Sequence, residues 1–99
     1  MKVLVVNSGS SSLKFTLFDM DDQSVLCKGQ VERIGLTDPK LTYKRADGLV
    51  KEEILTIQKH PEALRAVCEK LVDSELGVLK SLKEVDAIVT RKQKELMTI

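Results

Sequence analysis

Residues 3–14 read V-L-V-V-N-S-G-S-S-S-L-K: an apolar run, a turn of Asn, Gly and Ser, and the start of a second apolar segment. Leu4 to Val6 form a short continuous apolar run with β-branched residues, which predicts a strand buried on both faces. Gly9 tolerates positive φ angles, and the small serines beside it let backbone N–H groups converge on an anion. The pattern therefore predicts a hairpin that binds the phosphate groups of a nucleotide.

Two side chains at the edges of this turn carry further candidate chemistry. Asn7 ends the first strand and offers a carbonyl oxygen to a hydrated Mg²⁺ ion, although Mg²⁺ usually requires carboxylates as well. Lys14 places a compact positive charge just beyond the turn, within reach of a phosphoryl oxygen. An ordinary hairpin turn uses the same residue types, so composition alone leaves a structural role open. A Walker P-loop is excluded because the turn contains no Gly-Lys pair.

Residues 13–34 predict the rest of a three-stranded antiparallel meander. Alternation along residues 13–18 places Lys14 on the face opposite its apolar neighbours. The turn at residues 19–23 holds three aspartates, which we interpret as solvated because a metal ion needs convergent ligands. The third strand is expected to place four residues on one face: Val25, Cys27, Gly29 and Val31.

A second hairpin is predicted around Asp47-Gly48, which joins the extended runs 41–45 and 49–55. Charged residues dominate both runs, so we expect the pair, including Tyr43, to face solvent, with cross-strand charges steadying its register. This hairpin carries no predicted chemistry.

His60-Pro61 predicts the start of the main helix, because proline suits the first turn. An acid–base role for His60 is conceivable, but a capping or surface role is favoured because no base partner or nucleophile is near in sequence. Gly77 is expected to end the helical segment, and Ser81 with Glu84 has capping-box spacing before a strand at residues 85–89. The helix is expected to pack on the sheet through an apolar stripe of Leu64, Val67, Cys68, Leu71 and Val72.

The string from Asn7 to Lys14 closely resembles the N-terminal signature of acetate kinases, and it is similar to propionate kinases and, more loosely, to butyrate kinases. The resemblance continues through G-Q-V-E-R-I-G at residues 29–35 and extends to Ile88. It then departs from the family pattern. Where the family continues G-H-R-V-V-H-G-G, this chain reads V-T-R-K-Q-K-E from residue 89, which keeps Arg91 in register.

The resemblance implies an α/β fold: an RNase H-like half-domain of the actin-like ATPase superfamily, with a mixed sheet of about five or six strands and one main helix, truncated. It implies reversible phosphoryl transfer from ATP to acetate, giving acetyl phosphate and ADP. It further implies that Asn7 helps to hold Mg²⁺, that Ser10, Ser12 and Lys14 face the ATP phosphates, and that Arg91 pairs with the acetate carboxylate. A planar guanidinium can donate two hydrogen bonds to that group.

The departure after residue 88 shapes the expected organisation. We expect residues 1–89 to form the N-terminal part of an acetate kinase-like domain and residues 90–99 to form a divergent charged tail, either a helix or a frayed end. In the family, the acidic catalytic residue, a second arginine, a second phosphate loop and the adenosine pocket follow later, so no catalytic residue is expected here. The expectation is an N-terminal fragment that is inactive alone. The alternative is a noncatalytic module that binds a nucleotide or self-associates, as a homo-oligomer, through its incomplete sheet.

Bulk composition narrows the class of partner. The chain has 99 residues, one small domain, with 16 basic and 15 acidic residues and a net charge of +1, which argues against nucleic-acid and membrane partners. Its one Tyr and two Phe argue against base stacking. Cys27 and Cys68 lie far apart, and no signal peptide is recognised, so we expect a cytoplasmic protein.

Overall fold

The computed structural model describes residues 1–92. The part described contains six strands, one α-helix and one short 3₁₀-helix, η1. Their bounds are β1 Lys2–Ser8, β2 Leu13–Asp19, β3 Ser24–Glu32, β4 Lys40–Arg45, β5 Val50–Ile54, α1 His60–Leu71, η1 Leu82–Glu84 and β6 Val85–Lys92.

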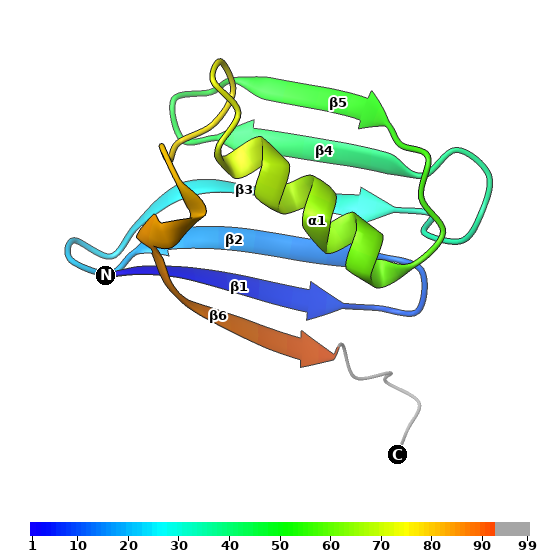
Figure 1. Ribbon diagram of the computed structural model, residues 1–99, viewed down its shortest axis with the longest axis horizontal. Coiled ribbons are helices and arrows are strands. Elements are labelled where there is room, and N and C mark those ends of the chain that lie inside the picture. The colour runs from blue at the N-terminus through cyan, green and yellow to red at the C-terminus, as the bar shows by residue number, and fades with distance from the viewer. Residues whose placement is uncertain (93–99) are drawn as a thin grey trace.

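The strands form one mixed sheet in the order β5-β4-β3-β2-β1-β6, and α1 lies across one of its faces (Figure 1). The strands β1 to β5 pair antiparallel with their neighbours, whereas β6 returns parallel to β1. The predicted mixed sheet with one main helix is therefore confirmed. Burial of β1 on both faces is wrong: Leu4 and Val6 are buried, but Val3 and Val5 are only half-buried, because α1 covers a single face.

Tyr43 lies in the core, so the prediction that it faces solvent is wrong. Phe15, Gly29 and Tyr43 stand in one row across β2, β3 and β4, and the two rings stack with centroids 6.4 Å apart. Gly29 makes this possible, since a Cβ atom there would lie 2.0 Å from the backbone oxygen of Thr42 and 2.8 Å from the Phe15 ring. The hydroxyl of Tyr43 donates a hydrogen bond to the carbonyl oxygen of Leu76 at 2.8 Å.

A β-bulge changes the faces of β3. The register shifts between Leu17, opposite Cys27, and Phe18, opposite Val25, so Leu26 has no partner in β2. The extra residue moves Val25 to the surface, where it is 38% exposed, while Cys27 and Val31 are buried. The expectation that Val25 shares their face is wrong for this reason.

Helix α1 begins at the predicted residue but ends earlier than predicted. The Glu62 carboxylate accepts hydrogen bonds from the backbone N–H groups of Gln58 and Lys59 at 2.9 and 3.0 Å, which satisfies donors at the helix start. The helix ends at Leu71, well before Gly77. The residues that it buries against the sheet are Ala63, Val67 and Leu71, and three residues of the predicted stripe, Leu64, Cys68 and Val72, are partly buried.

The last strand begins at a capping box and runs further than predicted. Ser81 Oγ accepts a hydrogen bond from Lys83 N, and Glu84 accepts from Ser81 N, each at 3.2 Å, so this prediction is confirmed. Strand β6 continues through Lys92, so residues 90–92 extend the sheet. The remainder of the expected tail, residues 93–99, lies outside the described residues.

Candidate functional site

The β1–β2 hairpin and the carboxyl end of β6 lie at the same end of the sheet, together with the β3–β4 loop and the segment that enters α1 (Figure 1). Because β1 and β6 are parallel, their carboxyl ends point in one direction, which is where α/β sheets commonly bind ligands. The turn is closed by a hydrogen bond from Gly9 N to Ser12 O at 2.8 Å.

Three of the predicted site residues form a row across three neighbouring strands. Asn7 in β1 pairs with Lys14 in β2 on one side and with Arg91 in β6 on the other. Residues paired in register point to the same face of a sheet, and the alternate residues Leu13 and Phe15 are buried under α1. The row therefore lies on the face opposite α1, and the structure brings together residues that are far apart in the sequence.

The row is cationic at both ends. Lys14 and Arg91 are exposed and Asn7 is half-buried, and no ion pair within residues 1–92 involves either cation. Two positive charges flanking an amide suit an anionic group such as a phosphate or a carboxylate.

Two serines of the turn have different surroundings. Ser10 lines a hollow of about 470 Å³ with Ser8, His60 and Lys92. Ser8 in β1 and Lys92 in β6 directly follow Asn7 and Arg91 of the row, so they face the opposite side of the sheet. The hollow therefore lies on the α1 side. Ser12 uses its backbone oxygen to close the turn. The turn does not use the positive φ that Gly9 permits; among the glycines of residues 1–92, such angles occur at Gly35 and Gly48.

His60 contacts the β1–β2 hairpin, and this contact was not predicted from the sequence. Its Nε2 atom lies 2.8 Å from the carbonyl oxygen of Gly9 and 3.2 Å from that of Ser12. Carbonyl oxygens only accept hydrogen bonds, so Nε2 carries the proton and donates to both. No local pattern signals this contact, because it depends on where the chain places the start of α1 relative to a turn some fifty residues earlier.

The donor set fits Mg²⁺ only together with phosphate. Within residues 1–92 no three His, Cys, Asp or Glu side chains gather as a metal site, and the Asn7 amide has a cation on each side. A divalent ion alone would be repelled there. The oxygen of Asn7 can contribute to a Mg²⁺ ion whose other ligands are phosphate oxygens and water, as this ion commonly is bound.

Asp19, Asp21 and Asp22 lie at the junction of β2 and β3, at the end of the sheet opposite the β1–β2 hairpin (Figure 1), and each has a local structural partner. Asp21 pairs with the N-terminal ammonium of Met1 at 2.8 Å, and Asp19 accepts from the backbone N–H of Asp21. Asp22 accepts from both the backbone and the hydroxyl of Ser24, and these bonds hold the pKa of its carboxyl below the usual value.

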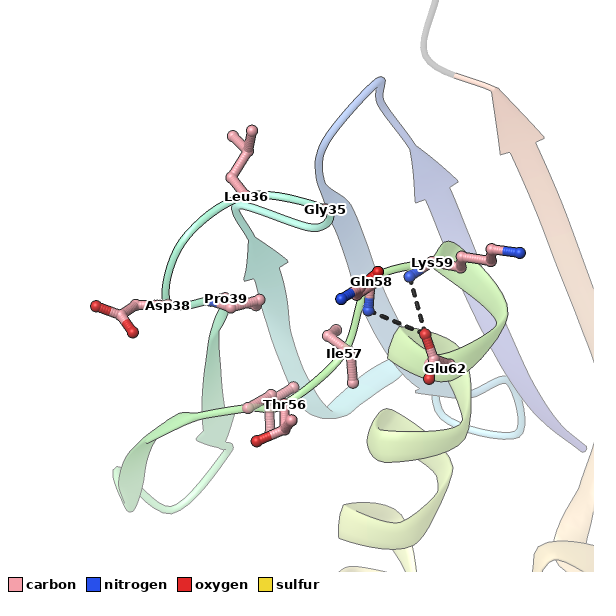
Figure 2. A pocket seen from close by; sticks show the side chains of 10 residues that line it. Gly35, Leu36, Asp38, Pro39, Thr56, Ile57, Gln58, Lys59 and Glu62 are labelled. Carbon is pink, nitrogen blue, oxygen red and sulfur yellow. Dashed lines mark hydrogen bonds between the residues drawn. The ribbon is translucent and has the colours of Figure 1, made fainter.

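A larger hollow, of about 770 Å³, opens between the β3–β4 loop and the segment before α1 (Figure 2). Its Glu62 carboxylate is already bound to the backbone of Gln58 and Lys59, as the dashed lines in Figure 2 mark. The Asp38 and Lys59 side chains point away from one another, toward opposite sides of the view (Figure 2). The hollow therefore gathers no set of convergent reactive groups from the residues that line it.

The two cysteines are free thiols, Cys27 buried and Cys68 partly buried. Burial raises the pKa of Cys27 to about 11 and also raises the pKa of Cys68, which keeps both protonated near neutral pH.

Among the helices in residues 1–92, none has the length and apolar character that a membrane crossing requires.

Comparison with known proteins identifies the family. The profile of the Acetokinase family matches residues 2–94. The chain belongs to this family. The acetate kinase resemblance, which was predicted to extend to Ile88, is thus confirmed, and the profile match continues to residue 94.

Individual acetokinase relatives agree in sequence and in structure. The chain is 57% identical over 89 residues to an acetate kinase of Finegoldia magna, covering 89% of this chain and 22% of that protein. Against an acetate kinase of Methanosarcina acetivorans it is 49% identical over 88 residues, with the same coverage. The chain thus spans about 22% of the length of these curated relatives.

Solved structures of an acetate kinase and a propionate kinase share the fold. The crystal structure of Porphyromonas gingivalis acetate kinase matches with a TM-score of 0.86 and 35% identity, covering 90% of this chain and 22% of that one. A propionate kinase from Francisella tularensis matches with a TM-score of 0.75 and 26% identity, covering 90% and 21%. The fold class predicted from the resemblance is therefore confirmed.

Proposed function

We propose that this chain supplies part of the phosphate- and carboxylate-binding site of an acetate kinase, a phosphotransferase that uses a carboxyl group as acceptor. The observation that carries the proposal is the row of Lys14, Asn7 and Arg91 beside the serine turn. Support also comes from the family match and from relatives named acetate kinase.

The chemistry suits such a site. An acetate oxygen attacks the γ-phosphorus of ATP, the new P–O bond forms acetyl phosphate, and the bond to the β,γ-bridging oxygen breaks with its electrons leaving on ADP. Acetate is already ionised near neutral pH, so no base is needed to deprotonate the nucleophile. The protein must mainly align the reactants and neutralise the charge on the transferring group.

Each predicted residue has a role in this proposal. Lys14, with Ser10 and Ser12 of the turn, contacts the ATP or ADP phosphates, and Arg91 pairs with the carboxylate of acetate or a similar short acid. Asn7 contributes an oxygen to Mg²⁺ held mainly by the phosphates. When bound, that ion neutralises phosphate charge during the transfer.

We also propose that the 99-residue chain does not turn over by itself, and that activity requires the remaining length found in its relatives. The check is an assay for ATP-dependent acetyl phosphate formation by the purified chain. Detectable, enzyme-dependent product would contradict inactivity and leave the binding proposal standing.

The two free cysteines are consistent with a protein of the reducing cytoplasm.

Calorimetric titration of MgATP into the purified chain tests the binding site. We expect Lys14→Ala to weaken binding about tenfold or more, the scale of one lost charge-assisted hydrogen bond. Arg91→Ala is expected to leave ATP affinity nearly unchanged, because its partner is the carboxylate. Lys51→Ala is the matched control, since it removes an exposed lysine from β5, at the far edge of the sheet. Equal affinity for the wild type and Lys14→Ala would sink the proposal.

Self-association is a second candidate, favoured by the outer edge of the sheet. Among the described strands β6 pairs only with β1, and its Ile88 and Val89 side chains are 52% and 37% exposed. An unpaired apolar edge strand can add a strand from a second copy. We expect sedimentation to show concentration-dependent dimers that Ile88→Lys abolishes. A monomer at all concentrations would rule this candidate out.

A further inference from the structure

The side chain of His60, at the start of helix α1, contacts the β1–β2 turn. Its Nε2–H lies between the carbonyl oxygens of Gly9 and Ser12, at 2.8 and 3.2 Å, and its ring is partly buried. We infer that His60 is a positioning residue that holds the β1–β2 turn in the shape that receives an anion. This inference rests on the proposed function, because it concerns the turn that is proposed to bind the ATP phosphates.

The turn needs such a support because it makes few backbone hydrogen bonds of its own within residues 1–92. Among these residues, a bond from Gly9 N to Ser12 O at 2.8 Å closes the turn, and a bond from Ile34 N to Ser11 O, also 2.8 Å, joins it to the β3–β4 loop. Small polar residues provide little packing. A third attachment from the start of α1 therefore restrains both ends of the turn.

The direction of the peptide groups links this restraint to anion binding. The peptide bond is planar, and residues 1–92 contain no cis bond, so each C=O points opposite to the N–H of the next residue. When His60 holds the Gly9 carbonyl toward α1, the Ser10 N–H is directed away from it. No backbone hydrogen bond within residues 1–92 uses this N–H, and Ser10 is exposed.

Loss of the two His60 hydrogen bonds would change which backbone groups the turn offers to an anion. A freed Gly9 peptide could rotate and expose its carbonyl oxygen, whose negative end repels phosphate. His60 thereby keeps a donor facing the ligand and keeps two acceptors occupied. It acts through the turn and need not touch the phosphate.

Two substitutions separate the hydrogen bond from the ring. His60→Gln keeps an N–H donor at nearly the reach of Nε2, and His60→Phe keeps a planar ring without a donor. Binding of MgATP is measured by calorimetry, and amide hydrogen exchange of Gly9 is followed by NMR in the same 99-residue proteins. Lys59→Ala, at the neighbouring exposed residue, is the control.

We expect His60→Phe to speed Gly9 exchange and to weaken MgATP binding about tenfold, while His60→Gln remains within about threefold of the wild type. Equal losses in both variants would overturn the assignment to the Nε2–H donor. Wild-type exchange or wild-type affinity in His60→Phe would overturn the positioning role.

The two readouts also separate this inference from the proposed function. If the wild-type chain binds no MgATP, the proposed function fails, and Gly9 exchange alone decides whether His60 restrains the turn. If MgATP binds and Lys14→Ala weakens it while His60→Phe does not, the proposed function holds and the positioning role is rejected.

Discussion

At the scale of single residues, Tyr43 joins the sheet to the segment after α1. Its ring is fully buried, and its hydroxyl donates to the Leu76 carbonyl at 2.8 Å. Burial raises the pKa of this phenol well above its usual value, so the hydroxyl keeps its proton and donates this bond near neutral pH.

We predict that Tyr43→Phe lowers the free energy of unfolding by about 1 kcal/mol, because it removes one partly buried hydrogen bond and keeps the ring. Urea unfolding followed by circular dichroism measures the change. The control is Lys51→Ala, an exposed position paired with Tyr43 in the sheet. Unfolding of Tyr43→Phe at the wild-type midpoint would mean that the hydroxyl contributes nothing to stability.

At the scale of elements, the meeting of β2, β3 and β4 depends on the missing side chain of Gly29. A methyl group there would overlap the Thr42 backbone oxygen and the Phe15 ring, and the backbone oxygen cannot move without breaking the strand pairing. We predict that Gly29→Ala lowers the free energy of unfolding by about 1–3 kcal/mol, the usual range for overpacking.

Thermal unfolding of Gly29→Ala is compared with that of Gly48→Ala. Gly48 has open space around it but a φ angle of 99°, so its substitution strains the backbone and leaves the core unaltered. We expect Gly29→Ala to be the more damaging change and to alter the near-ultraviolet circular dichroism of the stacked rings. Equal, small effects would indicate that the strands separate easily at this point.

At the scale of the whole molecule, carboxylates secure several turns and helix starts. Hydrogen bonds hold the pKa values of these groups below their usual range. The pKa of Asp47 is lowered to about 2, mainly by the hydrogen bond from the Arg45 side chain. The pKa values of Glu62 and Glu84 are lowered by hydrogen bonds that they accept from backbone N–H groups. Asp73, bonded to Leu76 and Glu75, behaves in the same way.

Acid should therefore destabilise the fold. A carboxyl whose pKa is lower when folded than when unfolded stabilises the protein fully above the unfolded pKa, about 4, and the stabilisation is lost as the pH falls through the folded pKa. We predict a constant urea midpoint between about pH 7 and 5.5 and a falling one from about pH 4.5 to 2. In Asp47→Asn the fall should be shallower. A midpoint that stays constant down to pH 2 would contradict this account.

Local patterns predicted much of the fold. Alternation identified β2 and the exposure of Lys14, Pro61 marked the start of α1, and Asp47-Gly48 marked the tight hairpin, because periodicity and turn chemistry act over a few neighbouring residues. The string from Asn7 to Lys14 was sufficient to indicate the family. These properties depend only on residues close together in the chain.

Tertiary structure decided what depends on distant residues. Since α1 covers only one face of the sheet, β1 is not buried on both sides. Tyr43 enters the core because its register with Gly29 and Phe15 places it on the face that α1 covers. Parallel pairing of β1 with β6 sets Arg91 beside Asn7, and the path into α1 brings His60 to the turn. No sequence period encodes these contacts, because strand order and register arise from how the whole chain buries its apolar surface.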